Sequence, residues 1–382
     1  MEIKDDIYYI GANDEKLDLF ESQYKVPNGM SYNSYLIKDE KNVVFDTIDK
    51  SVSEIWLKKL EKALNGEKVD FLIISHLEPD HAYNIGVLAK KYPNMKLVGN
   101  AMTFNILPKF FEDIDLENRK IVVKEGDTLE IGKHKLKFFM APMVHWPEVM
   151  FTYEETDKIL FSADAFGKFG AIKEDDKWLD EARRFYIGIV GKYGPQVQAI
   201  LKKVQDLNIK IICPLHGFVL KNELRFYIEK YAKWSSYEPE EDGTLIVCSS
   251  IHGNTLKAGK YLEQCFKNQK KNVLFMDITR EDMSEAIARA FQYSKLIVMS
   301  SSYNTGVFPP MENFLNGLKS RNYQNRKVSI IENGSWAPSA GKTMKSILQE
   351  MKNIDIIEPI ITIESTMKDK TKKELEELAN NM

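Results

Sequence analysis

Four side chains that could bind metal occur within the short segment Ser75–His81, which reads Ser-His-Leu-Glu-Pro-Asp-His. The segment directly follows the apolar run Phe71–Ile74, which predicts a buried strand. Pro79 forbids a continuous helix here, so we expect the ligands to lie on a loop at the strand end, around a common centre. The four candidate ligands are His76, Glu78, Asp80 and His81.

Three further candidate ligands each follow an apolar run that predicts a strand. His145 follows Leu136–Met140, Asp164 follows Ile159–Phe161, and His216 follows Ile209–Cys213. Because the ends of packed strands meet at a common edge, we expect these residues to join the first four. His134, by contrast, lies between two lysines in a predicted turn, and we expect it to be exposed to solvent.

Seven nitrogen and oxygen ligands exceed what one tetrahedral zinc ion needs, and a shared carboxylate can bridge two metals. The pattern therefore predicts a dinuclear site. Three carboxylates without a thiolate favour iron or manganese, although imidazole also suits zinc and ligand type alone does not decide.

A second candidate binding site begins with the segment Ser249–Thr255, which directly precedes a helix predicted over Leu256–Phe266. Hydroxyl groups and free backbone amides at a helix N-terminus favour a phosphate group. Two later loops, Ser300–Gly306 and Asn333–Gly341, combine glycine with an aromatic residue that could flank a planar ring. The candidate binding residues are Ser249, His252, Gly253, Asn254, Thr255, Ser301, Tyr303, Asn304, Gly306, Asn333, Gly334, Ser335 and Trp336.

The elements that must position these residues fall into two predicted domains, residues 1–240 and 243–382, joined by the linker Tyr237–Gly243. The first combines hairpin-like alternation near its start with later strands and helices, which indicates sheet packed on sheet and covered by helices. In the second, five apolar strands alternate with amphipathic helices, which predicts a doubly wound parallel sheet. Those strands are Thr244–Cys248, Val273–Met276, Leu296–Ser300, Val328–Ile331 and Ile356–Ile361.

Composition excludes several classes of protein. The 382 residues carry a formal net charge of −3, with basic and acidic residues interleaved, so no nucleic-acid partner is expected. No apolar run approaches the ~20 residues that cross a bilayer, which predicts a cytoplasmic protein without a membrane partner. Three cysteines without a C-x-x-C spacing predict neither disulfides nor a zinc ribbon.

The His76-x-Glu78-x-Asp80-His81 segment, with His145, Asp164 and the His216 of Pro-Leu-His-Gly, resembles the diiron site of the flavodiiron proteins. These proteins build it on a metallo-β-lactamase-like fold. Position 78 is usually histidine in hydrolytic relatives, so its carboxylate resembles the redox branch. The resemblance implies that one iron is bound by His76, Glu78 and His145, the other by Asp80, His81 and His216, and that Asp164 bridges them.

The three loops of the second domain resemble those of flavodoxin, with the departure that Ala337 stands where many relatives carry glycine. The resemblance thus spans the chain and implies an α/β protein. Its N-terminal part would be a metallo-β-lactamase-like αββα sandwich, and its C-terminal part a flavodoxin-like doubly wound parallel sheet that binds FMN.

The activity implied by the resemblance is reduction of dioxygen to water, nitric oxide to nitrous oxide, or both, with FMN and two Fe per chain. The chain ends soon after the flavodoxin-like part, so an external electron donor such as rubredoxin or a deazaflavin is expected. A head-to-tail homodimer, or a dimer of such dimers, is also implied. The alternatives are a dinuclear zinc hydrolase with an accessory flavodoxin domain and a non-enzymatic electron carrier.

Overall fold

The computed structural model describes residues 2–174 and 177–382. The chain divides into two compact units. The first unit consists of Met1–Tyr186 and Pro195–Ala232, and the second of Ile187–Gly194 and Lys233–Met382. None of the helices in the described ranges has the length and apolar character that crossing a membrane requires.

The first unit contains two larger sheets. The seven-stranded sheet has the order β1 (Glu2–Lys4), β2 (Ile7–Tyr9), β7 (Tyr35–Ile37), β8 (Val43–Phe45), β9 (Phe71–Ile73), β10 (Lys96–Gly99) and β11 (Lys120–Val122). The five-stranded sheet has the order β12 (Thr128–Glu130), β13 (Lys135–Met140), β14 (Met150–Glu154), β15 (Ile159–Phe161) and β16 (Ile211–Cys213). Two small hairpins pair β3 (Ala12–Asp14) with β6 (Met30–Tyr32), and β4 (Leu19–Phe20) with β5 (Tyr24–Lys25).

The two sheets share one apolar core, because buried residues of both belong to the same cluster. At its centre Phe45 of β8 stacks on Phe161 of β15, with ring centroids 3.8 Å apart. Strands such as β8 and β15 consist wholly of buried apolar residues. Such runs suit strands that are covered on both faces. Sheet packed on sheet, as expected from the sequence, is confirmed.

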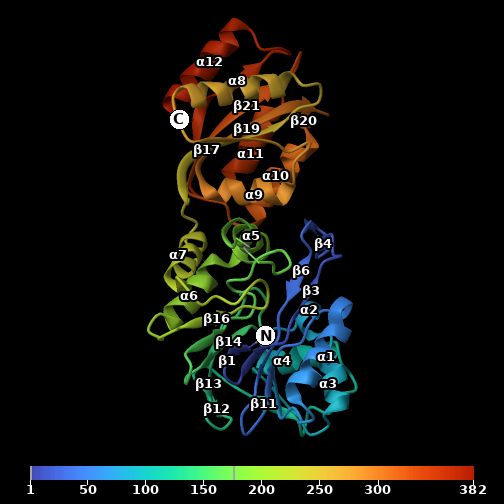
Figure 1. The fold of residues 1–382 in the computed structure, drawn as a ribbon. Coiled ribbons are helices and arrows are strands. Elements are labelled where there is room, and N and C mark those ends of the chain that lie inside the picture. Colours follow the sequence, from blue (N-terminus) through green and yellow to red (C-terminus); the bar gives the residue numbers. More distant parts are fainter. Residues whose placement is uncertain (1, 175–176) are drawn as a thin grey trace. The chain divides into compact units, whose positions relative to one another are not determined.

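Helices connect these strands, and Figure 1 shows α1 and α3 on one side of the first unit and α6 on the other. Asn65 ends α1 in the left-handed conformation, with φ 50°, which asparagine tolerates better than most residues. The helices up to residue 235 are α1 (Ser53–Leu64), α2 (Pro79–Ala82), α3 (Ile85–Lys91), α4 (Ala101–Ile106), α5 (Leu179–Phe185), α6 (Gly194–Val204) and α7 (Leu224–Ser235).

The second unit is built on a parallel sheet with the order β18 (Val273–Asp277), β17 (Glu241–Ser249), β19 (Tyr293–Tyr303), β21 (Arg326–Asn333) and β22 (Ile354–Ile363). All five strands expected from the sequence are present. The first strand lies inside the sheet, between the second and the third, so the strand order reverses beside β17. The carboxyl ends of strands at such a reversal form a crevice where these sheets bind ligands.

Helices alternate with these strands along the chain and lie on both faces of the sheet in Figure 1. They are α8 (Asn254–Asn268), α9 (Met283–Gln292), α10 (Pro309–Ser320), α11 (Ala340–Gln349) and α12 (Asp369–Asn381), and the short strand β20 (Gly306–Val307) pairs with β19. Asp282 caps α9 by accepting hydrogen bonds from the amides of Ser284 and Glu285. The doubly wound parallel sheet predicted from the sequence is confirmed.

Candidate dinuclear metal centre and flavin pocket

The segment after β9 delivers four side chains to one place in the first unit. His76 and Glu78 lie on the loop, as expected. The expectation that Asp80 and His81 also lie on a loop was wrong, because both belong to the one-turn helix α2, which begins at Pro79. The backbone N–H of the first helical residue has no hydrogen-bond partner inside a helix, so a proline at that position loses no hydrogen bond. Pro79 therefore starts this helix instead of preventing it.

The other three candidate ligands follow β13, β15 and β16, as the sequence predicted. His145 lies five residues after β13, and Asp164 and His216 each lie three residues after their strands. Gly167 permits the close approach of two of these loops. A Cβ atom there would lie 2.9 Å from the Asp164 carbonyl oxygen and 3.3 Å from the His216 Cβ.

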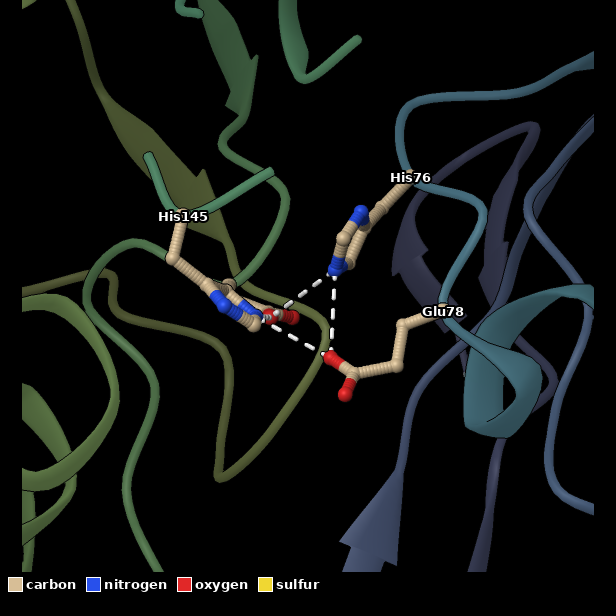
Figure 2. Close-up of side chains that lie close together, drawn as sticks. His76, Glu78 and His145 are labelled. Atoms are coloured by element: carbon tan, nitrogen blue, oxygen red, sulfur yellow. Dashed lines mark hydrogen bonds and ion pairs between the residues drawn. The ribbon is translucent and has the colours of Figure 1, made fainter. Parts of the chain in front are cut away.

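The first ligand group consists of His76, Glu78, His145 and one oxygen of Asp164, with ligand atoms within 4.8 Å of one another. The Glu78 Oε2 atom lies 3.3 Å from His76 Nε2 and 3.0 Å from His145 Nε2. The Asp164 Oδ2 atom lies 3.1 Å from His145 Nε2 and 3.6 Å from His76 Nε2. Figure 2 shows the three labelled side chains pointing toward one another.

The second group consists of Asp80, His81 and His216, all buried. The Nε2 atoms of the two histidines are 3.0 Å apart, and Asp80 Oδ2 lies 3.3 Å from one and 3.4 Å from the other. The Asp164 Oδ1 atom lies 3.1 Å from His81 Nε2 and 3.7 Å from His216 Nε2. The two oxygens of Asp164 therefore face different ligand groups.

These distances fit two metal ions. Bonds of about 2.1 Å to nitrogen or oxygen place neighbouring ligand atoms about 3.0 Å apart at right angles and about 3.4 Å apart at the tetrahedral angle. Both carboxylate oxygens of Asp80, and Oδ1 of Asp164, are buried without a hydrogen-bond partner among the described residues. Buried carboxylates without partners are strongly unfavourable, and metal coordination would satisfy them.

The electrostatics of the group also favour cations. Burial opposes the charged form of His145, but hydrogen bonds to Asp164 and Glu78 outweigh it and raise the pKa of His145 to about 9. Burial raises the pKa of Glu78, yet hydrogen bonds from His145 and His76 hold that pKa below its usual value. The same lone pairs that attract protons would bind metal ions.

Residues outside the ligand set orient two of the histidines. His76 Nδ1 donates to Glu148 Oε1 at 2.9 Å, and His216 Nδ1 donates to the Ser31 carbonyl oxygen at 2.8 Å. Each bond leaves the lone pair of Nε2 facing the centre, as in many metal sites. Glu148 is fully buried, and sequence reasoning missed it although it lies only three residues after His145.

Aromatic rings surround both groups. Trp146 meets His76 edge to face, with centroids 5.2 Å apart. Phe20, Tyr32 and Phe185 surround His216 at centroid distances of 5.5, 5.8 and 5.3 Å. These rings form an apolar wall that lowers the local dielectric constant around the ligands.

The expectation that His134 is exposed to solvent was wrong. Its side chain is fully buried, and its Nδ1 donates to Glu154 Oε1 at 3.0 Å. Its lysine neighbours suggested a solvated turn, and their side chains are indeed partly exposed, whereas the imidazole faces the carboxylates of Asp6 and Glu154.

The second unit has a cavity of about 680 Å³ at the carboxyl ends of β17, β19 and β21. Ligand pockets in proteins commonly have such volumes. Ten of the candidate binding residues line it: His252, Asn254, Thr255, Ser301, Tyr303, Asn304, Asn333, Gly334, Ser335 and Trp336. Six more residues of the three predicted loops also line it, although they were not singled out: Ser250, Ile251, Ser302, Thr305, Ala337 and Ser339. Ser365 lies outside those loops, and sequence reasoning missed it.

Three candidates do not line the cavity: Ser249, Gly253 and Gly306. Ser249 is fully buried and shares a hydrogen bond with Ser300, so its hydroxyl is used inside the sheet. Gly253 instead permits the turn before α8, since its φ of 87° suits glycine.

The cavity fits FMN in its chemistry. Hydroxyl and amide groups gather at the N-terminus of the 15-residue helix α8, which suits a phosphate group. Trp336 and Tyr303, with exposed fractions of 91% and 44%, lie at the lining and offer flat faces to a planar ring. Thr255 joins the three loops, because its Oγ1 is hydrogen-bonded to Ser301 and to Asn333 at 3.0 and 3.2 Å.

Comparison with known proteins agrees with this geometry. The family model described as ODP family beta lactamase matches residues 30–217. The anaerobic nitric oxide reductase flavorubredoxin of Vibrio vulnificus is 28% identical over 347 residues, which are 87% of this chain and 70% of that protein.

Solved structures extend the likeness over the whole chain. Rubredoxin oxygen:oxidoreductase from Desulfovibrio gigas superposes with a TM-score of 0.92 at 25% identity, over 100% of this chain and 96% of that one. The flavodiiron protein from Giardia intestinalis gives the same TM-score at 22% identity, over 100% and 95% of the two chains, and supports the fold. The chain combines two ligand groups that meet at one carboxylate in its first unit with a flavodoxin-like sheet in its second, and over its whole length it is similar to the flavodiiron oxidoreductases.

Proposed function

We propose that this chain reduces dioxygen to water, nitric oxide to nitrous oxide, or both, at two iron ions that receive electrons through FMN. One observation carries the proposal. The Asp164 carboxylate offers Oδ2 to one ligand group and Oδ1 to the other, with contacts of 3.1 Å on each side. A carboxylate in that position holds two metals close enough to act on one small molecule.

The residues that we propose as ligands divide into two sets around this carboxylate. Asp164 would hold both ions, and Glu148 and the Ser31 carbonyl would keep two imidazole rings oriented. The first ion would be held by His76, Glu78 and His145, and the second by Asp80, His81 and His216.

The iron pair and the FMN, when bound, supply two electrons each, which together match the four that reduce dioxygen to water. The protein residues would control the charge and the solvent around the ions. The carboxylates would balance the charge of the ions, and the rings of Trp146, Phe20 and Phe185, which pack on two of the histidines, would exclude bulk water around the ligands.

The flavin site that we propose is the cavity at the ends of β17, β19 and β21. Its phosphate would lie at the N-terminus of α8, near Asn254 and Thr255, and its ring system between the loops that carry Tyr303 and Trp336. A single phosphate-binding loop favours FMN over FAD.

Metal analysis separates this function from that of a zinc hydrolase. We expect protein purified from its native source to contain about two irons and one FMN per chain, because three carboxylates and four histidines without a thiolate suit iron. The named relatives are reductases, which also favours the redox function. Two zinc ions with no iron would contradict the proposal.

The partners are inferred from the relatives. Rubredoxin, named as the partner of the Desulfovibrio gigas enzyme, is the donor class that we propose first, and a deazaflavin second. We also propose a head-to-tail homodimer, or a dimer of such dimers, in which the flavin of one chain serves the irons of the other. We propose a domain boundary between residues 240 and 243 and a location in the cytoplasm.

A further inference from the structure

A second cluster of candidate metal ligands lies at the opposite end of the five-stranded sheet from the dinuclear centre. The centre follows the carboxyl ends of β13 and β15, whereas this cluster lies where the same strands begin. Its members are His134, just before β13, Asp157, in the turn between β14 and β15, and Asp6, in the turn between β1 and β2. It therefore joins turns from both sheets of the first unit.

One ring nitrogen of His134 is held by a carboxylate, and the other is left facing the cluster. Its side chain is fully buried, and its Nδ1 donates to Glu154 Oε1 at 3.0 Å. Glu154 is fixed in turn, since it accepts hydrogen bonds from the backbone amides of Thr156 and Asp157 at 2.7 and 2.6 Å. A carboxylate that holds one ring nitrogen directs the lone pair of the other toward a metal.

Three ligand atoms converge beyond that ring. His134 Nε2, an Asp6 oxygen and an Asp157 oxygen lie within 4.8 Å of one another, and His134 Nε2 lies 3.1 Å from Asp6 Oδ1. None of His134 Nε2, Asp6 Oδ1 and Asp157 Oδ2 has a hydrogen-bond partner among the described residues, and all three atoms are buried. The Nε2 and Oδ1 atoms are close but not aligned as donor and acceptor.

Buried acceptors that converge without a donor between them need a cation. Lys133 supplies one positive charge, but its Nζ pairs at 2.7 Å with Asp6 Oδ2 and does not donate to Asp6 Oδ1. A nitrogen and two carboxylate oxygens suit zinc and the neighbouring divalent metals.

We propose that His134, Asp6 and Asp157 bind one divalent transition-metal ion, with Zn²⁺ as the representative ion, and that this ion fastens the two sheets together. The site is separate from the iron centre and needs neither iron nor flavin. Its role would be structural, because its ligands come from turns of both sheets of the first unit.

The first test measures zinc binding by protein whose dinuclear site is already filled with iron. The protein is dialysed against buffered Zn²⁺, and iron and zinc are quantified together, so that replacement of iron is recognised. We expect one zinc per chain in addition to the irons. Zinc that appears only as iron is lost, or no zinc at all, would overturn the proposal.

Substitutions assign the zinc to the cluster. Asp6→Asn and Asp157→Asn should each weaken zinc binding at least tenfold and leave the iron content unchanged, whereas Asp5→Asn, at the neighbouring turn position, should bind zinc as the parent does. Glu154→Gln should weaken it about 10- to 100-fold, as loss of an orienting partner does. Equal zinc binding by the parent and the two aspartate variants would overturn the assignment.

A third measurement keeps the test decisive if a variant folds poorly. Crystals of the parent protein soaked in Zn²⁺ and measured at the zinc absorption edge should give an anomalous peak within about 2.0–2.2 Å of His134 Nε2. The alternative is a proton on Nε2, which the Glu154 and Asp6 charges favour because they outweigh burial and raise the pKa of His134. A soaked crystal with no peak there would establish that alternative and exclude the metal.

Discussion

The bridging role proposed for Asp164 depends on where its side chain is held. Its carboxylate is almost fully buried and lies three residues after β15, where Gly167 lets the neighbouring His216 loop approach closely. Burial alone would raise the pKa of Asp164, but the charges of His81 and the hydrogen bond from His145 hold that pKa well below its usual range. The carboxylate is thus ionised and ready to bind two cations.

Replacing Asp164 by alanine should remove a ligand from both metals at once. We expect iron in the Asp164→Ala protein to fall from about two per chain to well below one, while Glu78→Ala retains about one, because Glu78 contacts only the first group. Iron analysis after gel filtration measures this, with Asp113→Ala at an exposed position as the control. An Asp164→Ala protein that kept both irons and full turnover would refute the bridging role.

At the scale of elements, chemistry in both units is placed at the carboxyl ends of strands. Apolar runs such as Phe71–Ile73 and Ile159–Phe161 could be recognised in the sequence because strands covered on both faces contain few polar residues. The polar residues that follow such runs were therefore predictable as site residues. Glycine and hydroxyl residues after β17 indicated the flavin pocket in the same way.

What the sequence did not predict depended on contacts between distant segments. Pro79 begins a helix instead of preventing one, because only the surrounding fold decides whether the chain turns helical after it. His134 is buried by turns far away in sequence, including the one that carries Asp6. Glu148 and Ser31 became visible only once the strands brought their oxygen atoms to the ring nitrogens of His76 and His216.

Thr255 tests how the three loops of the second unit cooperate. In Thr255→Val the hydroxyl that contacts Ser301 and Asn333 is lost, and with it the donor that we propose for the phosphate. Hydrogen bonds to charged groups contribute about 1.5–3 kcal/mol, so the dissociation constant for FMN should rise about 10- to 100-fold. Thr255→Ser, which keeps the hydroxyl, should bind FMN within a few-fold of the parent. Unchanged FMN binding by Thr255→Val in a fluorescence titration would show that the loops do not depend on this residue.

At the scale of the whole molecule, the chain combines two units whose sites have different chemistry. One holds a cluster of hard ligands for metal, and the other a cavity for a flavin. The chain passes between the units at three places, after Tyr186, Gly194 and Ala232, and these connections would restrict how far the flavin of one chain can move toward its own metals. This motivates the proposed exchange of electrons between the chains of a dimer.

Mixing two defective variants tests that exchange. One variant, Asp164→Ala, lacks metal, and the other, Thr255→Val with Trp336→Ala, lacks flavin. When equal amounts of the two are unfolded together and refolded with iron and FMN limiting, about half of the dimers should be mixed and each should have one intact flavin paired with one intact metal site, so about a quarter of the parent activity should be recovered. Activity no higher than the sum of the separate variants would contradict transfer between chains.

The most direct test of the central claim is a single-turnover experiment on the holoprotein. The protein is reduced fully without oxygen and then mixed with a limiting amount of dioxygen or of nitric oxide, and the products are quantified. We predict that at least one gas is consumed, dioxygen yielding water with little hydrogen peroxide, or nitric oxide yielding one nitrous oxide for every two molecules. If neither gas were consumed by protein that contains iron and FMN, the assignment as a gas reductase would be contradicted.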